Sequence, residues 1–208
     1  MLLGIYSYTV ILTYVGMLVG YTGITFALGG EIQSALICLM IAGVCDMFDG
    51  KIASTKKNRT IQERRFGIQI DSLSDLICFG ALPAVIVYVV SAGSYVSLVL
   101  GGFFLLCGLI RLAWFNVDEE ERQDNSAGSR EVYYGLPITT SALIIPALVG
   151  LGRMWGWPLE VLAPAALLLV GCAYVTRFRL KKPGLAGKIA MILLGVAELV
   201  ILIVGVKA

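Results

Sequence analysis

The chain has 208 residues, of which 58% are hydrophobic and only 14% charged, with a formal net charge of +2 and no histidine. Because soluble domains carry roughly a quarter charged residues, this composition excludes an ordinary soluble enzyme. The weak positive charge also excludes a nucleic-acid-binding module. Without histidine, neither a Ser-His-Asp nor a Cys-His triad can form. The composition therefore predicts an all-α, polytopic membrane helical bundle.

Charged residues divide the chain into about seven apolar segments long enough to cross a membrane, which takes about 20 residues each. We expect these spans at residues 8–28, 31–54, 68–92, 95–116, 136–153, 158–176 and 186–206. The first segment lacks the basic flank of a cleavable signal, so we expect it to be retained. No soluble domain and no internal repeat interrupts the pattern. We therefore expect a single membrane domain over residues 1–208.

The five cysteines are odd in number and never form a CxxC pair. Disulfide frameworks and structural zinc sites need paired or closer spacing. We therefore expect all five to be small buried or lipid-facing residues, at Cys38, Cys45, Cys78, Cys107 and Cys172.

Cationic residues cluster in the linkers that follow the second, fourth and sixth segments. They are Lys56, Lys57, Arg59, Arg64 and Arg65, then Arg122 and Arg130, then Arg177, Arg179, Lys181 and Lys182. Linkers after every second span fall on one side, and cations mark the cytoplasmic side. The pattern predicts a cell-membrane protein with its N-terminus inside. Some of these cations can also attract anionic lipid headgroups or phosphates.

Four aspartates lie in apolar sequence, where a carboxylate costs about 2.5–3.5 kcal/mol at a helix centre. Asp46 and Asp49 are three residues apart, and Asp71 and Asp75 are four apart, so each pair shares a helical face. Two such pairs at neighbouring helix ends would form a strongly negative pocket. Hard divalent cations such as Mg²⁺ or Mn²⁺ prefer oxygen ligands of this kind. Since magnesium commonly shares substrate phosphates as ligands, the pocket predicts a phosphorylated substrate.

A glycine accompanies each pair, Gly50 beside the first and Gly67 before the second. Glycine allows backbone or ligand to approach closely. Two structural alternatives remain open at this point. The second pair, with Ser72, can cap the start of a helix. The first pair can form ion pairs with Lys51 or Arg111.

The spacing of these residues resembles the signature of the CDP-alcohol phosphotransferase family. The matching positions are Asp46-x-x-Asp49-Gly50-x-x-Ala53 and Gly67-x-x-x-Asp71-x-x-x-Asp75. Stretches at 71–84, 111–117 and 134–142 resemble the family branch that makes phosphatidylserine. Ser54 and Trp114 stand where the family has arginines, and the linker from Ser54 to Gly67 exceeds the family's spacing by about one helical turn.

The resemblance implies transfer of a phosphatidyl group from CDP-diacylglycerol to an alcohol, with release of CMP. The flanking stretches favour L-serine as the acceptor, with glycerol 3-phosphate or inositol phosphate as alternatives. The resemblance also implies a homodimer among membrane lipids and an active site on the cytoplasmic side.

Roles for individual residues follow from the same resemblance. The metal ligands for Mg²⁺ or Mn²⁺ would be Asp46, Asp49, Asp71 and Asp75, with Asp75 also as general base. The CDP-lipid would contact Asp46, Asp49, Gly50, Ala53, Gly67 and Asp71. Arg59, Arg64 or Arg65 would replace the missing arginine at Ser54, and Arg111 and Asn116 would end a helix and contact the acceptor or a phosphate.

Two other classes of protein also use or tolerate intramembrane charge. An ion-coupled transporter would employ the carboxylates for ions or protons. Such proteins often carry corresponding features in both halves, whereas here all four aspartates lie within the first 75 residues. A non-catalytic membrane scaffold would not need clustered carboxylates.

Overall fold

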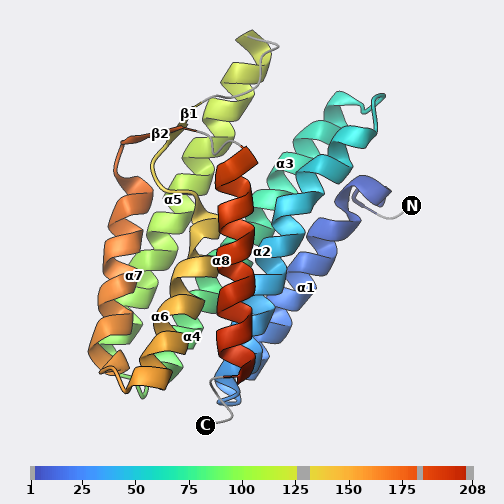
Figure 1. Cartoon of the computed structure of the whole chain (residues 1–208). Coiled ribbons are helices and arrows are strands. Elements are labelled where there is room, and N and C mark those ends of the chain that lie inside the picture. The colour runs from blue at the N-terminus through green and yellow to red at the C-terminus, as the bar shows by residue number, and fades with distance from the viewer. Residues whose placement is uncertain (1–2, 126–131, 182–184, 205–208) are drawn as a thin grey trace.

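The computed structural model describes residues 3–125, 132–181 and 185–204. Its helices are α1 (Tyr8–Leu28), α2 (Ile32–Thr55), α3 (Ile61–Asp75), the π-helix η1 (Leu76–Ala81), α4 (Leu82–Val90), α5 (Tyr95–Asn125), the 3₁₀ turn η2 (Ile138–Thr140), α6 (Ser141–Trp155), α7 (Leu159–Val175) and α8 (Leu185–Val204). The helices stand side by side in one bundle (Figure 1).

Five helical runs are long and apolar enough to cross a membrane. They are Tyr8–Leu28, Ile32–Thr55, Ile61–Val90, Tyr95–Glu121 and Ile138–Trp155, with shorter apolar helices at Leu159–Val175 and Ile192–Ile203. These runs correspond to the expected segments, and the prediction of a polytopic all-α membrane protein is confirmed. The chain is an integral membrane protein.

Two helices extend beyond the predicted spans. The expectation that the third begins at residue 68 is wrong, because α3 begins at Ile61. Thr60 and Glu63 form a capping box there, in which Glu63 N donates to Thr60 Oγ1 at 3.1 Å and Thr60 N donates to Glu63 Oε2 at 2.9 Å. The expectation that Arg111 and Asn116 end a helix is also wrong, because α5 continues to Asn125.

A short antiparallel ribbon, which the sequence did not predict, joins two of the linkers. Strand β1 (Val132–Tyr134) pairs with β2 (Arg179–Lys181). The ribbon and the α2–α3 linker lie at the same end of the bundle (Figure 1). The basic linkers therefore share one end, as their spacing predicted. Arg130 and Lys182 lie outside the described residues.

Close packing of α1 depends on glycines along one face. A Cβ atom added at Gly20 would lie 2.5 Å from Cys78 Sγ, and one at Gly23 would lie 2.8 Å from Cys38 Cβ. Both distances are too short for real contacts, so α1 approaches its neighbours only because these positions lack side chains. All five cysteines are free, and all except the exposed Cys172 are buried. Their expected structural role fits this packing.

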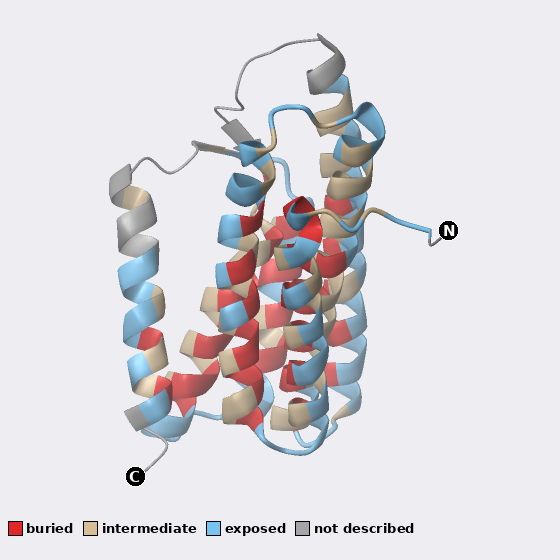
Figure 2. Cartoon of the chain, turned by 90° about the vertical axis from the view of Figure 1, so that its right-hand side faces the viewer, coloured by how far each residue is buried: buried red, intermediate tan, exposed pale blue. Residues whose placement is uncertain are grey.

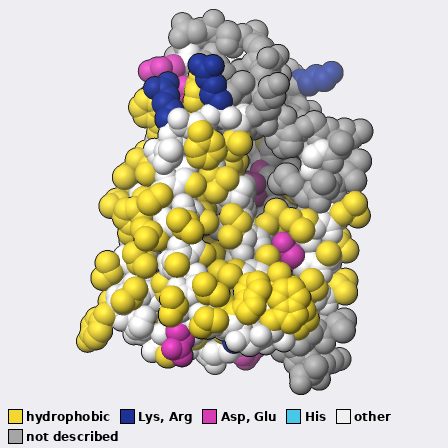
Figure 3. Space-filling model, turned by 60° about the vertical axis from the view of Figure 1, so that its left-hand side comes forward, with side chains coloured by type: hydrophobic (Ala, Val, Ile, Leu, Met, Phe, Trp, Pro, Cys, Tyr) yellow, Lys and Arg dark blue, Asp and Glu magenta, His cyan; other side chains and the backbone are white. Residues whose placement is uncertain are grey.

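The surface of the bundle divides into an apolar body and a charged end. Buried residues follow the interior, while α8 at the edge exposes much of its surface (Figure 2). In a space-filling view, hydrophobic side chains cover most of the height of one face, and Lys and Arg gather at one end (Figure 3). A membrane would cover the apolar body and leave the basic end in water or among headgroups.

Candidate metal and phosphate site

Three of the four aspartates meet between α2 and α3. Asp46 and Asp49 on α2 and Asp71 on α3 each offer a carboxylate oxygen, and these oxygens lie within 4.8 Å of one another. The linker between Thr55 and Ile61 returns the chain so that both helices present their aspartates to the same place. Three hard oxygen donors at this separation suit Mg²⁺ or Mn²⁺. The cluster can therefore bind a divalent metal.

Asp75 lies beside this cluster and is not one of its three members. Together with Asp46 and Asp49 it lines a small pocket between α1, α2 and α3. It is the last residue of α3, directly before the π-helix η1. π-helical turns inside α-helices often occur at functional sites. Here the carbonyl of Phe79 in η1 accepts a hydrogen bond of 3.0 Å from Ser141 Oγ on α6, which ties the turn to the bundle.

A cavity of about 160 Å³ opens next to the carboxylates. It is lined by Thr9, Val10, Thr13, Asp49, Gly50, Ala53, Arg59, Arg64, Gly67, Ile68 and Asp71. The cavity thus contains acidic and basic side chains in one space. It also includes the three small residues that the family resemblance assigned to the CDP-lipid.

The two glycines of the motif keep this cavity open. A Cβ atom added at Gly50 or at Gly67 would meet no atom within 4 Å, so both positions border empty space. Arg59 from the linker and Arg64 from the first turns of α3 line the same space, whereas Arg65 and Ser54 do not. The structure therefore distinguishes among the three arginines that the sequence left equivalent.

Thr13 on α1 is a site residue that the sequence analysis missed. Its Oγ1 donates a hydrogen bond of 3.1 Å to Oδ2 of Asp49, and the Asp49 side chain is only 8% exposed. Thr9 lies one turn earlier on α1 and lines the same cavity. Two threonines four residues apart within an apolar helix give one polar face. That spacing was the available signal.

Arg111 and Asn116 on α5 lie outside the cavity lining. Arg111 Nη1 donates a hydrogen bond of 2.8 Å to the carbonyl oxygen of Tyr134, at the end of β1. Asn116 Oδ1 accepts a hydrogen bond of 2.8 Å from Ser72 Oγ, which directly follows Asp71 in the sequence. Asn116 is therefore tied to α3 next to the cluster, while Arg111 holds the β ribbon.

The two structural alternatives for the aspartates are wrong. The second pair lies within and at the end of α3, whose cap is Thr60. Lys51 places its Nζ over the ring of Phe48, 5.0 Å from the centroid. Neither Asp46 nor Asp49 forms a salt bridge with Lys51 or Arg111, and the structure describes all four of these side chains.

Comparison with known proteins agrees with the motif and its geometry. The family model described as CDP-alcohol phosphatidyltransferase matches residues 8–206. The chain belongs to this family. Its match covers α1 to α8, including every residue of the aspartate cluster and of the neighbouring cavity.

Individual members of the CDP-alcohol phosphatidyltransferase family share part of the sequence. The chain is similar to the archaetidylserine synthase of Methanothermobacter thermautotrophicus, with 34% identity over 127 residues, 61% of this chain and 50% of that protein. It is 33% identical over 144 residues to the CDP-diacylglycerol–serine O-phosphatidyltransferase of Saccharomyces cerevisiae, covering 64% and 51%. The enzyme of that name in Helicobacter pylori is 24% identical over 180 residues, covering 84% and 72%. The chain spans about half the length of the first two.

Proposed function

We propose that the protein transfers the phosphatidyl group of CDP-diacylglycerol to L-serine, producing phosphatidylserine and CMP. The observation that carries this proposal is a cluster of three carboxylates next to a cavity with two arginines. Asp46, Asp49 and Asp71 form the cluster, and its members Asp49 and Asp71 line the cavity together with Arg59 and Arg64. The names of its relatives support serine as the acceptor. The whole length, residues 1–208, would act as one membrane domain, since the family match covers nearly all of it.

The chemistry of the cluster fits a divalent metal. We assign Asp46, Asp49 and Asp71 as ligands, with Asp75 as a further ligand or the base, and Mg²⁺ or Mn²⁺ as the ion. When bound, such an ion neutralises charge on the diphosphate and improves CMP as a leaving group. Arg59 lines the same cavity and would bind the nucleotide phosphates.

The chain's own residues account for the remaining steps. Gly50, Ala53 and Gly67 leave room for the CDP group, and Arg64 offers a further cation for its phosphates. The serine hydroxyl oxygen attacks the lipid-bearing phosphorus, and the bond from that phosphorus to the CMP oxygen breaks. Asp75, which lines a small pocket with Asp46 and Asp49, would accept the hydroxyl proton. Positioning and charge neutralisation would supply most of the acceleration, as in phosphoryl transfer generally.

We also propose an orientation and an assembly. The basic linkers lie at the end of the bundle from which the α2–α3 linker reaches the cavity, so the site would face the cytoplasm of a cell membrane. Asn116 and Arg111 remain candidates for the acceptor side of the site, because Ser72 holds Asn116 beside Asp71. A homodimer, surrounded by membrane lipids, is expected from the family resemblance.

An acceptor panel tests the activity. Purified full-length protein is incubated with CDP-diacylglycerol, Mn²⁺ or Mg²⁺, and one of L-serine, glycerol 3-phosphate or inositol phosphate. We expect CMP release and phosphatidylserine only with serine. Asp75→Asn should abolish turnover while retaining CDP-lipid binding. Glu31→Gln serves as the control, because Glu31 is an exposed carboxylate at the start of α2, at the end of that helix far from the aspartates. CMP release with another acceptor and none with serine would overturn the assignment of serine.

A flux measurement separates the enzyme from an ion-coupled transporter. The same protein is reconstituted in liposomes without CDP-lipid, and ion or proton flux is recorded. An enzyme should give no flux above empty liposomes. Flux that Asp75→Asn alters would contradict the proposed function and favour the transporter.

A further inference from the structure

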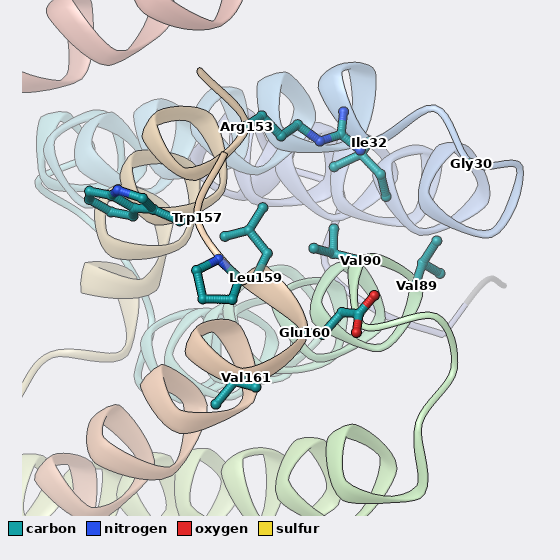
Figure 4. Close-up of a pocket in the computed structure, with 10 residues that line it drawn as sticks. Gly30, Ile32, Val89, Val90, Arg153, Trp157, Leu159, Glu160 and Val161 are labelled. Carbon is teal, nitrogen blue, oxygen red and sulfur yellow. The ribbon is translucent and has the colours of Figure 1, made fainter. Parts of the chain in front are cut away.

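A second and larger cavity lies away from the aspartates, where four helix ends meet. It has a volume of about 430 Å³, within the roughly 300–1,000 Å³ typical of small-molecule sites. Its walls come from the α1–α2 turn, the end of α4, the end of α6 and the start of α7, with Ile32, Val90, Arg153, Trp157 and Glu160 among the lining residues (Figure 4). None of these residues belongs to the site described above.

The cavity carries one charge of each sign on separate walls. Arg153 lies beside Ile32, and Glu160 lies across the cavity from it, with Val90 and Leu159 forming the apolar floor (Figure 4). The two charged side chains do not form an ion pair with each other, although both lie in the described part of the chain. Each suits its own helix end, a cation at the end of α6 and an anion at the start of α7. The favourable interaction of each charge with its own helix end does not explain why Arg153 and Glu160 line the same cavity.

The surroundings of this cavity have the character of a membrane boundary. The apolar runs Ile61–Val90 and Ile138–Trp155 end here. Trp155 and Trp157 lie in contact, with ring centroids 5.4 Å apart, and tryptophan is enriched at the level of lipid headgroups. Val161 on the rim of the cavity is 68% exposed, which gives an acyl chain an apolar surface to follow towards the bilayer centre.

We propose that this cavity binds the headgroup of a zwitterionic phospholipid. The Arg153 guanidinium would bind the lipid phosphate, and the Glu160 carboxylate would bind the amine. Both would be charge-assisted contacts. A purely anionic headgroup would satisfy Arg153 but face repulsion from Glu160. A water-soluble zwitterion would leave the apolar floor and Trp157 without contacts. This proposal is independent of the activity proposed for the aspartate site.

Lipid retention in native mass spectrometry tests the proposal. The full-length protein in detergent is equilibrated with phosphatidylethanolamine, phosphatidylcholine or phosphatidylglycerol of equal chain length. We expect both zwitterionic lipids to be retained more than phosphatidylglycerol. Arg153→Gln and Glu160→Gln should each weaken retention of phosphatidylethanolamine by about tenfold, as expected for loss of one hydrogen bond to a charged group.

Matched controls separate this cavity from the rest of the surface. Glu121→Gln and Lys57→Gln remove a charge of each sign at the opposite end of the bundle and should leave retention unchanged. The thermal midpoint of each lipid-free variant shows whether it is folded, which we expect because both cavity charges are exposed. Equal or stronger retention of phosphatidylglycerol by the unmodified protein, or unchanged retention in both cavity variants, would overturn the proposal.

Discussion

Thr13 Oγ1 on α1 donates a hydrogen bond of 3.1 Å to Oδ2 of Asp49 on α2. The bond fixes the orientation of one carboxylate of the cluster from a helix that supplies no carboxylate itself. Groups that orient metal ligands typically change metal affinity or activity by about 10- to 100-fold when they are removed. α1 therefore contributes to the candidate site through a hydrogen bond as well as through packing.

Replacing Thr13 with valine tests this positioning role. Valine keeps the shape of threonine but cannot donate to Asp49, so we expect the Mn²⁺ concentration needed for half-maximal CMP release to rise by about tenfold. Thr13→Ser retains the hydroxyl and should restore most of the affinity. An unchanged Mn²⁺ requirement in the valine variant would show that Asp49 does not depend on this bond.

Direct metal binding provides a readout that does not depend on turnover. Electron paramagnetic resonance of Mn²⁺ titrated into the protein should show tight binding that EDTA reverses, and Asp46→Asn or Asp71→Asn should weaken it strongly, because each removes a charged oxygen ligand from the cluster. Glu31→Gln should bind as the unmodified protein does. Identical titrations for all variants would place the metal elsewhere.

Three arginines near the α2–α3 linker should differ in their effect on the CDP-lipid. Arg59 and Arg64 line the cavity and Arg65 does not. We expect Arg59→Gln and Arg64→Gln to raise the KM for CDP-diacylglycerol by about tenfold each, the loss of one hydrogen bond to a charged group. Arg65→Gln, the neighbouring control on the same helix, should stay close to the unmodified value. A larger effect at Arg65 would contradict the assignment made from the cavity.

The sequence predicted the bundle and the aspartate motif well because both depend on local pattern. Long apolar runs specify spans. The spacing within each aspartate pair specifies one helical face per pair, and the structure brings carboxylate oxygens of Asp46, Asp49 and Asp71 within 4.8 Å of one another. The start of α3 could also have been predicted, since Thr60-x-x-Glu63 is a capping-box sequence. The predicted span began later because the first turns of α3 carry charged residues.

Other features depend on contacts between distant segments, and local pattern does not encode them. The β1–β2 ribbon joins residues 132–134 to 179–181, and the π-helix after Asp75 is held by Ser141, 62 residues beyond Phe79. Whether Arg64 or Arg65 lines the cavity depends on how α3 is rotated, and the position of Arg59 depends on the path of the α2–α3 linker. None of these three features could be predicted before the three-dimensional structure was known.

The final prediction concerns the glycines that let α1 pack against the site helices. A Cβ added at Gly23 would lie 2.8 Å from both Cys38 Cβ and Leu82 Cδ2, and the Cys38 atom cannot move without its backbone. Overpacking of this kind typically costs about 1–3 kcal/mol, so Gly23→Ala should lower the thermal midpoint in detergent. Gly102→Ala is the matched control, because a Cβ there meets no atom within 4 Å and alanine favours a helix by about 1 kcal/mol over glycine. It should leave the midpoint unchanged or raise it. Equal midpoints for the two variants would mean that α1 can shift away from α2 without loss, and that the packing of α1 does not depend on this glycine.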